Sequence, residues 1–299
     1  MSKQEQMGFK KFCERYSDEA ACRKQLKGMR WPKGFVCPRC GCADGYDIPT
    51  RQKHQCKKCR YQVSVTSGTV MHRSHLPLTT WFWAIYLVAN DKRGYSASQL
   101  SRQLELPYST AWFLLHRIRD AMGQRDAEYL LSGLVELDDT YFGGPTSGGK
   151  RGRGTDKTKV MAAVSLNEKG KPQFLRMQVV PNLRGKTIGA FAQSNIAPHS
   201  TILSDALLSY RKPLAEKYLH QYSVYDPQTG LLHWLHTLVG NAKAAVMGTF
   251  HGLAPKHLQR YLDEFCFRFN RRFFHANLFF RLLNSVARAQ PCPLSALTL

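Results

Sequence analysis

The fold of this 299-residue chain is decided by the stretch Leu134-Val135-Glu136-Leu137-Asp138-Asp139-Thr140-Tyr141-Phe142-Gly143-Gly144. The apolar residues at its start predict a β-strand over residues 134–138 that finishes in a carboxylate. Glu136 and Asp138 lie on one face of such a strand, because successive side chains point to opposite sides. A carboxylate there is costly unless it binds something. Taken singly, Asp138 could also be a turn or cap residue.

Three further stretches have strand character, at residues 159–166, 174–180 and 201–205. The turn at residues 167–170 joins the first two in a predicted hairpin. Residues 186–192 and most of the chain after 230 favour helix, so the predicted fold class is mixed α/β. Asp205 ends its strand as Asp138 does. Carboxylates at neighbouring strand ends can hold Mg²⁺ or Mn²⁺, and a pair of such ions promotes phosphoryl transfer.

Four cysteines lie in two pairs, Cys37-Pro38-Arg39-Cys40 and Cys56-Lys57-Lys58-Cys59. Each pair forms one knuckle, and two knuckles complete a tetrahedron of sulfur ligands around Zn²⁺. A closed site of this kind is structural. Cys42 is an alternative to Cys40. The surrounding unit is basic, which suits either DNA contact or protein docking.

Residues 76–123 favour helices, two of which span 96–104 and 109–122 with a short turn between them. This pattern suits a helix-turn-helix or an ordinary helical hairpin. As a DNA reader, the second helix would present Tyr108, Ser109, Thr110, His116 and Arg119.

The chain carries 43 Lys and Arg against 21 Asp and Glu, a net charge of +22. Such a positive field indicates binding to nucleic acid. A hydrophobic content of 43% excludes a largely disordered protein. A basic, glycine-rich loop next to Asp138 suits contact with the DNA backbone through Lys150, Arg151 and Arg153. Without a signal peptide or a long apolar run, we expect a cytoplasmic, nucleoid-associated protein with no membrane partner.

The chain resembles the DDE-type transposases of bacterial insertion sequences, which carry an N-terminal zinc ribbon and an RNase H-like core. The resemblance extends over most of the chain. The residues that carry it are Arg30-Trp31-Pro32, the Cys37–Cys59 ribbon, Thr66-Ser67-Gly68-Thr69, the Glu136–Gly144 block, Lys150-Arg151-Gly152-Arg153-Gly154, Asp205, Gly248-Thr249-Phe250-His251-Gly252, residues 256–265 and Arg268-Phe269-Asn270-Arg271-Arg272.

The resemblance implies a catalytic set of Asp138, Asp205, His236 and Lys243. Many relatives have Glu at the third position, and here that position falls on His236, with Asn241 as the alternative. Lys243 follows His236 by two helical turns, so both face the same way. The result is an Asp-Asp-His-Lys variant. Imidazole is a poorer ligand than carboxylate for Mg²⁺ and a better one for Mn²⁺.

The resemblance also implies a domain order: N-terminal helices at 1–32, a zinc ribbon at 33–70, a helix-turn-helix-like domain at 71–128, an RNase H-like catalytic domain at 129–285 and a tail at 286–299. The implied activity is metal-dependent cleavage and transfer of double-stranded DNA, with a homo-oligomer that joins the two transposon ends. Alternatives are a non-catalytic zinc-ribbon regulator, an RNA-binding protein, a nuclease without strand transfer and an inactive transposase copy.

Overall fold

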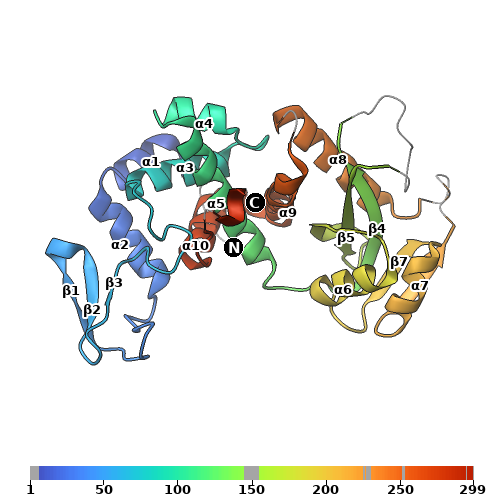
Figure 1. The fold of residues 1–299 in the computed structure, drawn as a ribbon, viewed down its shortest axis with the longest axis horizontal. Coiled ribbons are helices and arrows are strands. Elements are labelled where there is room, and N and C mark those ends of the chain that lie inside the picture. Colours follow the sequence, from blue (N-terminus) through green and yellow to red (C-terminus); the bar gives the residue numbers. More distant parts are fainter. Residues whose placement is uncertain are drawn as a thin grey trace. The chain divides into compact units, whose positions relative to one another are not determined.

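A computed structural model describes residues 7–144, 155–224, 226, 230–250, 253–293 and 295–298 (Figure 1). The chain forms two compact units. The first unit combines the residues up to Arg125 with those from Phe273 onward, and the second unit is Asp126–Arg272. The second unit is therefore inserted into the first. Across the described residues, no helix is long and apolar enough to cross a membrane.

The first unit is mainly helical. Its helices are α1 (Phe9–Arg15), α2 (Glu19–Arg30), α3 (Leu78–Asn90), α4 (Ala97–Gln103), α5 (Tyr108–Asp126, whose last residue belongs to the second unit), α10 (Leu278–Arg288) and α11 (Ser295–Thr298). The Asp18 side chain caps α2 by accepting a hydrogen bond of 2.8 Å from the backbone N–H of Ala21.

Helix α10 packs on α3 and α2 within the first unit. Its Phe279 ring meets the Phe12 ring edge-on, with 5.5 Å between the centroids. The expected domain boundary at residue 285 falls inside α10, whereas the two units divide at Arg272. The reason is the apolar face of α10, which is covered by the N-terminal helices.

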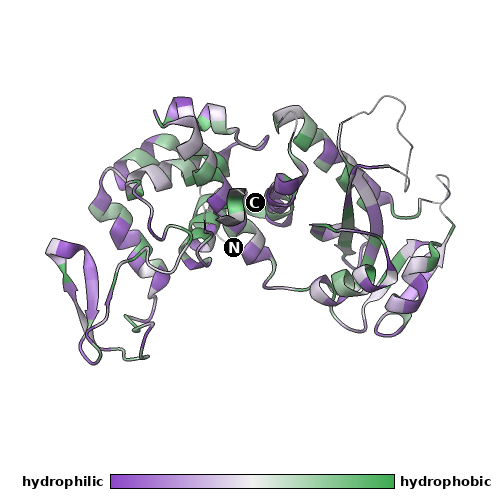
Figure 2. Ribbon diagram, viewed as in Figure 1, coloured by the Kyte–Doolittle hydropathy of each residue, from purple (hydrophilic) through white to green (hydrophobic). Residues whose placement is uncertain are grey.

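A small antiparallel sheet follows α2. It consists of β1 (Gly45–Ile48), β2 (Lys53–Cys56) and β3 (Gln62–Val63), with the 3-10 turn η1 (Pro49–Arg51) between the first two strands. The strands β1 and β2 are mainly hydrophilic, as Figure 2 shows. Four buried residues, Phe35, Cys37, Cys56 and Val63, form the small core of this ribbon. A core this small is typical of domains that depend on a metal for their stability.

The second unit is built on a five-stranded sheet in the order β6-β5-β4-β7-β8. Strands β4 (Leu134–Phe142), β5 (Thr158–Leu166) and β6 (Pro172–Val179) are antiparallel neighbours. Strands β7 (Thr201–Asp205) and β8 (Leu219–Ser223) run parallel to β4. The mixed sheet confirms the predicted α/β class and agrees with the RNase H-like core that the resemblance implies.

Helices cover both faces of this sheet. The elements beside the strands are α6 (Gly185–Asn195), α7 (Leu208–Ala215), α8 (His233–Phe250), η3 (Pro255–His257), α9 (Leu258–Asn270) and the 3-10 segment η4 (Arg272–Asn277), which continues into the first unit. Side chains from α6 and α7 form one apolar cluster with Val135 and Leu137 of β4. Residues of α8 and α9 form the other cluster, on the face to which Glu136 and Asp138 point.

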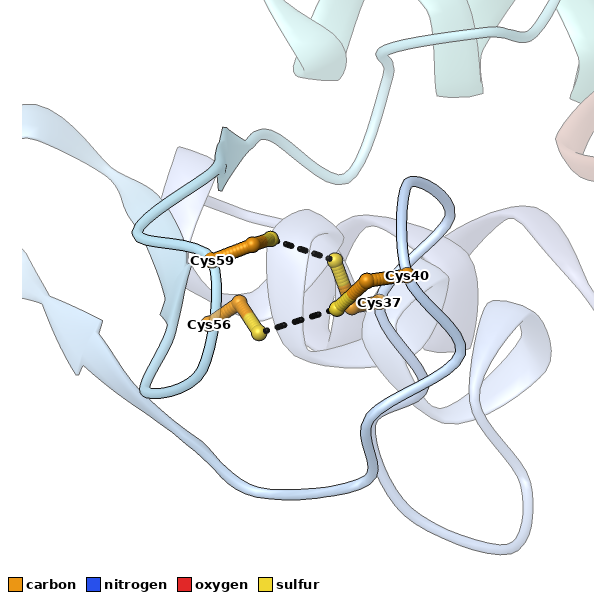
Figure 3. A group of neighbouring side chains, drawn as sticks. All are labelled: Cys37, Cys40, Cys56 and Cys59. Carbon is orange, nitrogen blue, oxygen red and sulfur yellow. Dashed lines mark hydrogen bonds between the residues drawn. The ribbon is translucent and has the colours of Figure 1, made fainter.

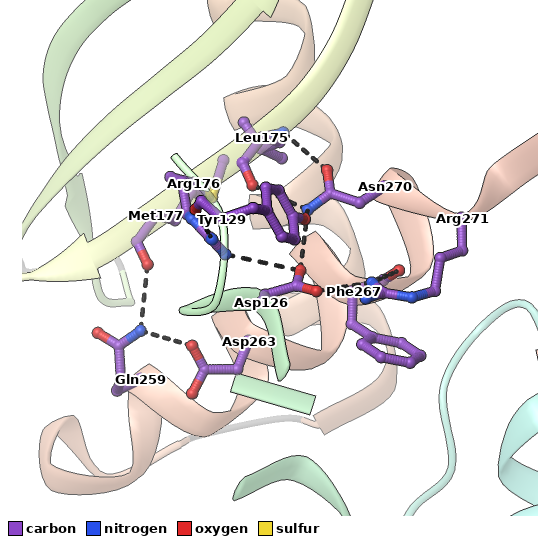
Figure 4. A network of polar contacts seen from close by, with 10 residues as sticks. All are labelled: Asp126, Tyr129, Leu175, Arg176, Met177, Gln259, Asp263, Phe267, Asn270 and Arg271. Carbon is purple, nitrogen blue, oxygen red and sulfur yellow. Dashed lines mark hydrogen bonds and ion pairs between the residues drawn. The ribbon is translucent and has the colours of Figure 1, made fainter. Parts of the chain in front are cut away.

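A buried polar network joins the two ends of the second unit (Figure 4). The Asp126 carboxylate pairs with Arg271 at 2.7 Å and with Arg176 at 3.7 Å. The Asn270 side chain accepts a hydrogen bond from the Leu175 backbone N–H at 2.7 Å and donates one to Asp126 at 2.8 Å. The network thus ties α9 to β6 and to the first residue of the unit.

Candidate active site and zinc ribbon

Asp138 and Asp205 end up on neighbouring strands at the same level. The parallel pairing of β4 with β7 sets Glu136 opposite Leu203. Two residues further along each strand lie Asp138 and Asp205, on the face that Glu136 shares. The expected convergence of these two carboxylates therefore follows from the strand register.

His236 reaches this edge from α8. Its Nε2 atom lies 3.1 Å from Oδ2 of Asp138. The hydrogen bond to Asp138 raises the pKa of His236 above its usual value, although burial opposes the shift. Two residues that are 98 positions apart in the sequence are thus in direct contact.

Glu136 fixes the start of α8. Its side chain is only 5% exposed, and its Oε2 atom accepts a hydrogen bond of 2.7 Å from the backbone N–H of Leu235. The N–H groups in the first turn of a helix have no partner within the helix, so a carboxylate there stabilises the turn. Burial raises the pKa of Glu136, while this hydrogen bond lowers it. The sequence alone assigns no role to Glu136. Its two-residue spacing from Asp138 places both side chains on one face of the strand, and this was the signal that could have indicated a role.

A pocket of about 310 Å³ opens at this edge, lined by Asp138, Asp139, Thr140, His236, Val239, Gly240 and Lys243. Burial lowers the pKa of Lys243, and the nearby Lys157 lowers it further. Asn241, the alternative third ligand, is exposed and is not among the described residues that line this pocket. The pocket therefore combines an acidic edge with a cation on its helical wall.

Tyr210 of α7 contacts Asp139 from the face of the sheet opposite to α8. Its side chain is fully buried, and its hydroxyl donates a hydrogen bond of 3.1 Å to Oδ1 of Asp139. Burial raises the pKa of Tyr210, and the charges of Asp139, Asp138 and Asp205 raise it further. The tyrosine remains a neutral donor that orients Asp139 next to Asp138.

The four predicted zinc ligands meet in the ribbon (Figure 3). The ligand atoms of Cys37, Cys40, Cys56 and Cys59 all lie within 4.8 Å of one another. Sulfur atoms of the pairs Cys37–Cys59 and Cys40–Cys56 are 3.6 Å apart. Four sulfurs about 2.3 Å from one Zn²⁺ ion would be nearly this far apart, so the donor set fits the metal.

Cys42 lies outside this group, and its sulfur accepts a hydrogen bond from the Asp44 backbone N–H instead. Within the part of the chain that the structure describes, the four ribbon cysteines are the one set of three or more ligands this close together. The oxygen and nitrogen atoms of Asp138, Asp205 and His236 are more widely spaced.

The predicted DNA-reading residues of α5 divide into two groups. Ser109 is exposed and Thr110 is half-buried near the start of the helix. Arg119 and His116 are buried, and Nη2 of Arg119 donates to the Tyr95 carbonyl oxygen at 3.0 Å. The prediction that Arg119 faces DNA is corrected, because its helix face packs into the core. Lys150, Arg151 and Arg153 lie outside the described residues.

Two known domain families match the chain. Residues 17–62 match the transposase zinc-ribbon domain, and residues 130–270 match the ISXO2-like transposase domain. The chain is 25% identical over 158 residues to an uncharacterized protein in transposable element ISH50 of Halobacterium salinarum. That match covers 52% of this chain and 51% of the relative, so the chain spans about half the length of the curated relative.

Two solved structures share weaker similarity. The catalytic core domain of BIV integrase has 17% sequence identity and a TM-score of 0.30, over 44% of this chain and 81% of the integrase chain. The Mos1 strand transfer complex has 14% identity and a TM-score of 0.28, over 69% of this chain and 77% of the other. A transposase zinc ribbon at residues 17–62 and an ISXO2-like transposase domain at residues 130–270 are therefore matched in this chain, in that order.

Proposed function

We propose that this transposase binds the terminal inverted repeats of its insertion sequence, cleaves a strand at each end and joins the freed 3′-hydroxyl to target DNA. The observation that carries the proposal is the contact between His236 and Asp138, beside Asp205 and in one pocket with Lys243. Two carboxylates and one imidazole, from three elements, support the proposal, since the strand register brings the carboxylates to one edge and the imidazole contacts one of them.

In this proposal Asp138, Asp205 and His236 hold Mg²⁺ or Mn²⁺. The oxygen-rich set suits either ion, and the imidazole tilts it toward Mn²⁺. The bound ions supply activation of the attacking oxygen and stabilisation of the leaving oxygen. The wider spacing of the three residues would leave ligand positions for DNA or water oxygens. The hydrogen bond between His236 and Asp138 holds the imidazole ring beside the carboxylate.

Lys243 would hold the phosphate next to the scissile bond. It follows His236 by two turns of α8 and lines the same pocket. A lysine ammonium acts there as a point charge that needs no exact angle. The protein itself contributes positioning, which is the main requirement when the metal ions carry the developing charge.

The first unit would bind the transposon ends. Five exposed basic residues lie close together in the second half of the ribbon: Arg51, Lys53, Lys57, Lys58 and Arg60. They can neutralise phosphates without reading sequence, whereas the start of α5 would carry base contacts if α4 and α5 act as a helix-turn-helix. A structural Zn²⁺ would stabilise the ribbon, and two copies of the protein would hold the two ends.

The test uses the purified full chain, labelled inverted-repeat DNA and either Mg²⁺ or Mn²⁺. We expect cleavage at the transposon end and joining of the product to target DNA, both lost in Asp138→Ala and Asp205→Ala. Folding of each variant is checked by thermal unfolding. Equal cleavage by wild type and Asp138→Ala would refute the assignment, and sequence-specific binding without cleavage would indicate a regulator or an inactive copy.

A further inference from the structure

Gly240 occupies an unusual place in α8. It is exposed in the middle of an 18-residue helix, where glycine is among the most unfavourable residues. It also lines the active-site pocket, between His236 and Lys243 along the helix. Residues four and three positions apart share one helical face, so these three residues form a continuous strip along the pocket wall.

Neither packing nor backbone conformation requires a glycine here. Leaving the local helix backbone aside, no heavy atom of the described residues lies within 4 Å of the place a Cβ would take. The φ angle of Gly240 is not in the left-handed region, and an alanine would therefore fit the helix. The missing side chain leaves space on the pocket side of α8 that the described protein atoms do not use.

We propose that Gly240 is a substrate-contact residue: it lets the sugar-phosphate backbone at the scissile bond lie directly against α8. Glycine commonly marks places where a ligand backbone must come close. The charge around the strip suits this occupant, because Lys243 lies on one side of Gly240 and the metal-binding edge on the other. A Cβ would push the phosphate away from both. This inference rests on the proposed function, since it assumes that DNA fills the pocket.

The same helix offers a matched control. Gly248 is also exposed, and a Cβ built on it likewise meets no described heavy atom within 4 Å. It lies about 12 Å further along the helix axis. It is not among the pocket-lining residues. Alanine at either position should strengthen the helix to a similar degree, so any difference in activity reports on the pocket.

The experiment compares Gly240→Ala and Gly248→Ala in the full chain. Both should raise the midpoint of thermal unfolding by about 2 °C. Gly240→Ala should lower the single-turnover rate of end cleavage by about tenfold or more, because small displacements of a reacting group are costly. Its affinity for end DNA should stay close to wild type, since the first unit also binds. Gly248→Ala should cleave like wild type.

Each outcome decides the proposal. A stabilised Gly240→Ala protein that cleaves at the wild-type rate overturns it, and so does a loss of stability, which would mean that the space is occupied. Equal losses in both variants would also overturn it, because the effect would then belong to the helix. If the wild-type protein fails to cleave end DNA with either Mg²⁺ or Mn²⁺, the proposed function itself is refuted. The wild-type reaction alone distinguishes this result from the others.

Discussion

The zinc ribbon and the catalytic edge are two candidate metal centres built in opposite ways. The ribbon ligands come from two short knuckles within Cys37–Cys59, and their sulfurs are already grouped. The proposed catalytic ligands come from β4, β7 and α8, which are far apart in the sequence. A metal site whose ligands are close in sequence can be predicted from their spacing, and metal binding there contributes to folding. A site whose ligands are far apart in sequence forms only after the fold has brought them together.

The largest effect is expected from Cys56→Ser. The variant should lose zinc and unfold the ribbon, because structural zinc sites contribute about 10–16 kcal/mol in small domains. Metal content and hydrogen exchange measure the loss. The second unit should keep its exchange protection, since its two apolar clusters contain no ribbon residue. An equal loss of hydrogen-exchange protection in both units would show that the second unit also depends on the ribbon cysteines for its stability.

The second effect concerns His236, the proposed third catalytic ligand. His236→Glu should shift the ratio of Mg²⁺-dependent to Mn²⁺-dependent cleavage by about tenfold toward Mg²⁺, because carboxylate oxygen suits the harder ion. Cleavage rates at matched metal concentrations measure this ratio. Asn241→Asp is the control, and it should leave the ratio unchanged. Complete loss of Mg²⁺-dependent cleavage in His236→Glu, with the fold intact, would count against His236 as a ligand.

A smaller effect is expected at Glu136. Glu136→Ala leaves the Leu235 N–H buried without its acceptor, which should destabilise the protein by about 1–3 kcal/mol. It should also slow cleavage, because His236 then loses its fixed place beside Asp138. Glu136→Gln keeps an acceptor oxygen and should recover most of both. If the glutamine variant is as inactive as the alanine variant, Glu136 has a direct role with the metal instead.

The smallest effect is expected from Tyr210→Phe. It removes the hydrogen bond to Asp139 but keeps the buried ring, so about 1 kcal/mol of stability should be lost. Urea unfolding measures the difference, and cleavage should fall only slightly. A loss of cleavage as large as that of Asp138→Ala would show that Asp139, and not only Asp138, takes part in the reaction.

Strands that are buried could be predicted, and exposed ones could not. The sequence predicts β7 at its observed bounds and β4 from Leu134 to Asp138, whereas β4 continues to Phe142 because its last residues stay paired with β5. Strand β8 has the sequence Leu219-His220-Gln221-Tyr222-Ser223 and lies at the sheet edge, mostly exposed. Burial on one face produces the alternation that identifies a strand, and an uncovered edge lacks it.

The same limit applies to side chains. The ribbon cysteines were identified by spacing, because their geometry is local. Arg119 was placed on the wrong face because a buried arginine is rare, and its acceptor, the Tyr95 carbonyl, lies 24 residues away. The contacts of Glu136 with α8 and of Tyr210 with Asp139 each join β4 to a helix far away in the sequence, so no sequence period predicts them.

The ion pair between Asp126 and Arg271 has a consequence for the architecture of the gene product. The side chains of Asp126, the first residue of the inserted unit, and Arg271, its last but one, are 2.7 Å apart, so the chain enters and leaves this unit at nearby points. A short peptide that joins residues 125 and 273 could therefore replace the whole second unit. An inserted domain whose two ends lie close together can be gained, lost or exchanged as a single domain.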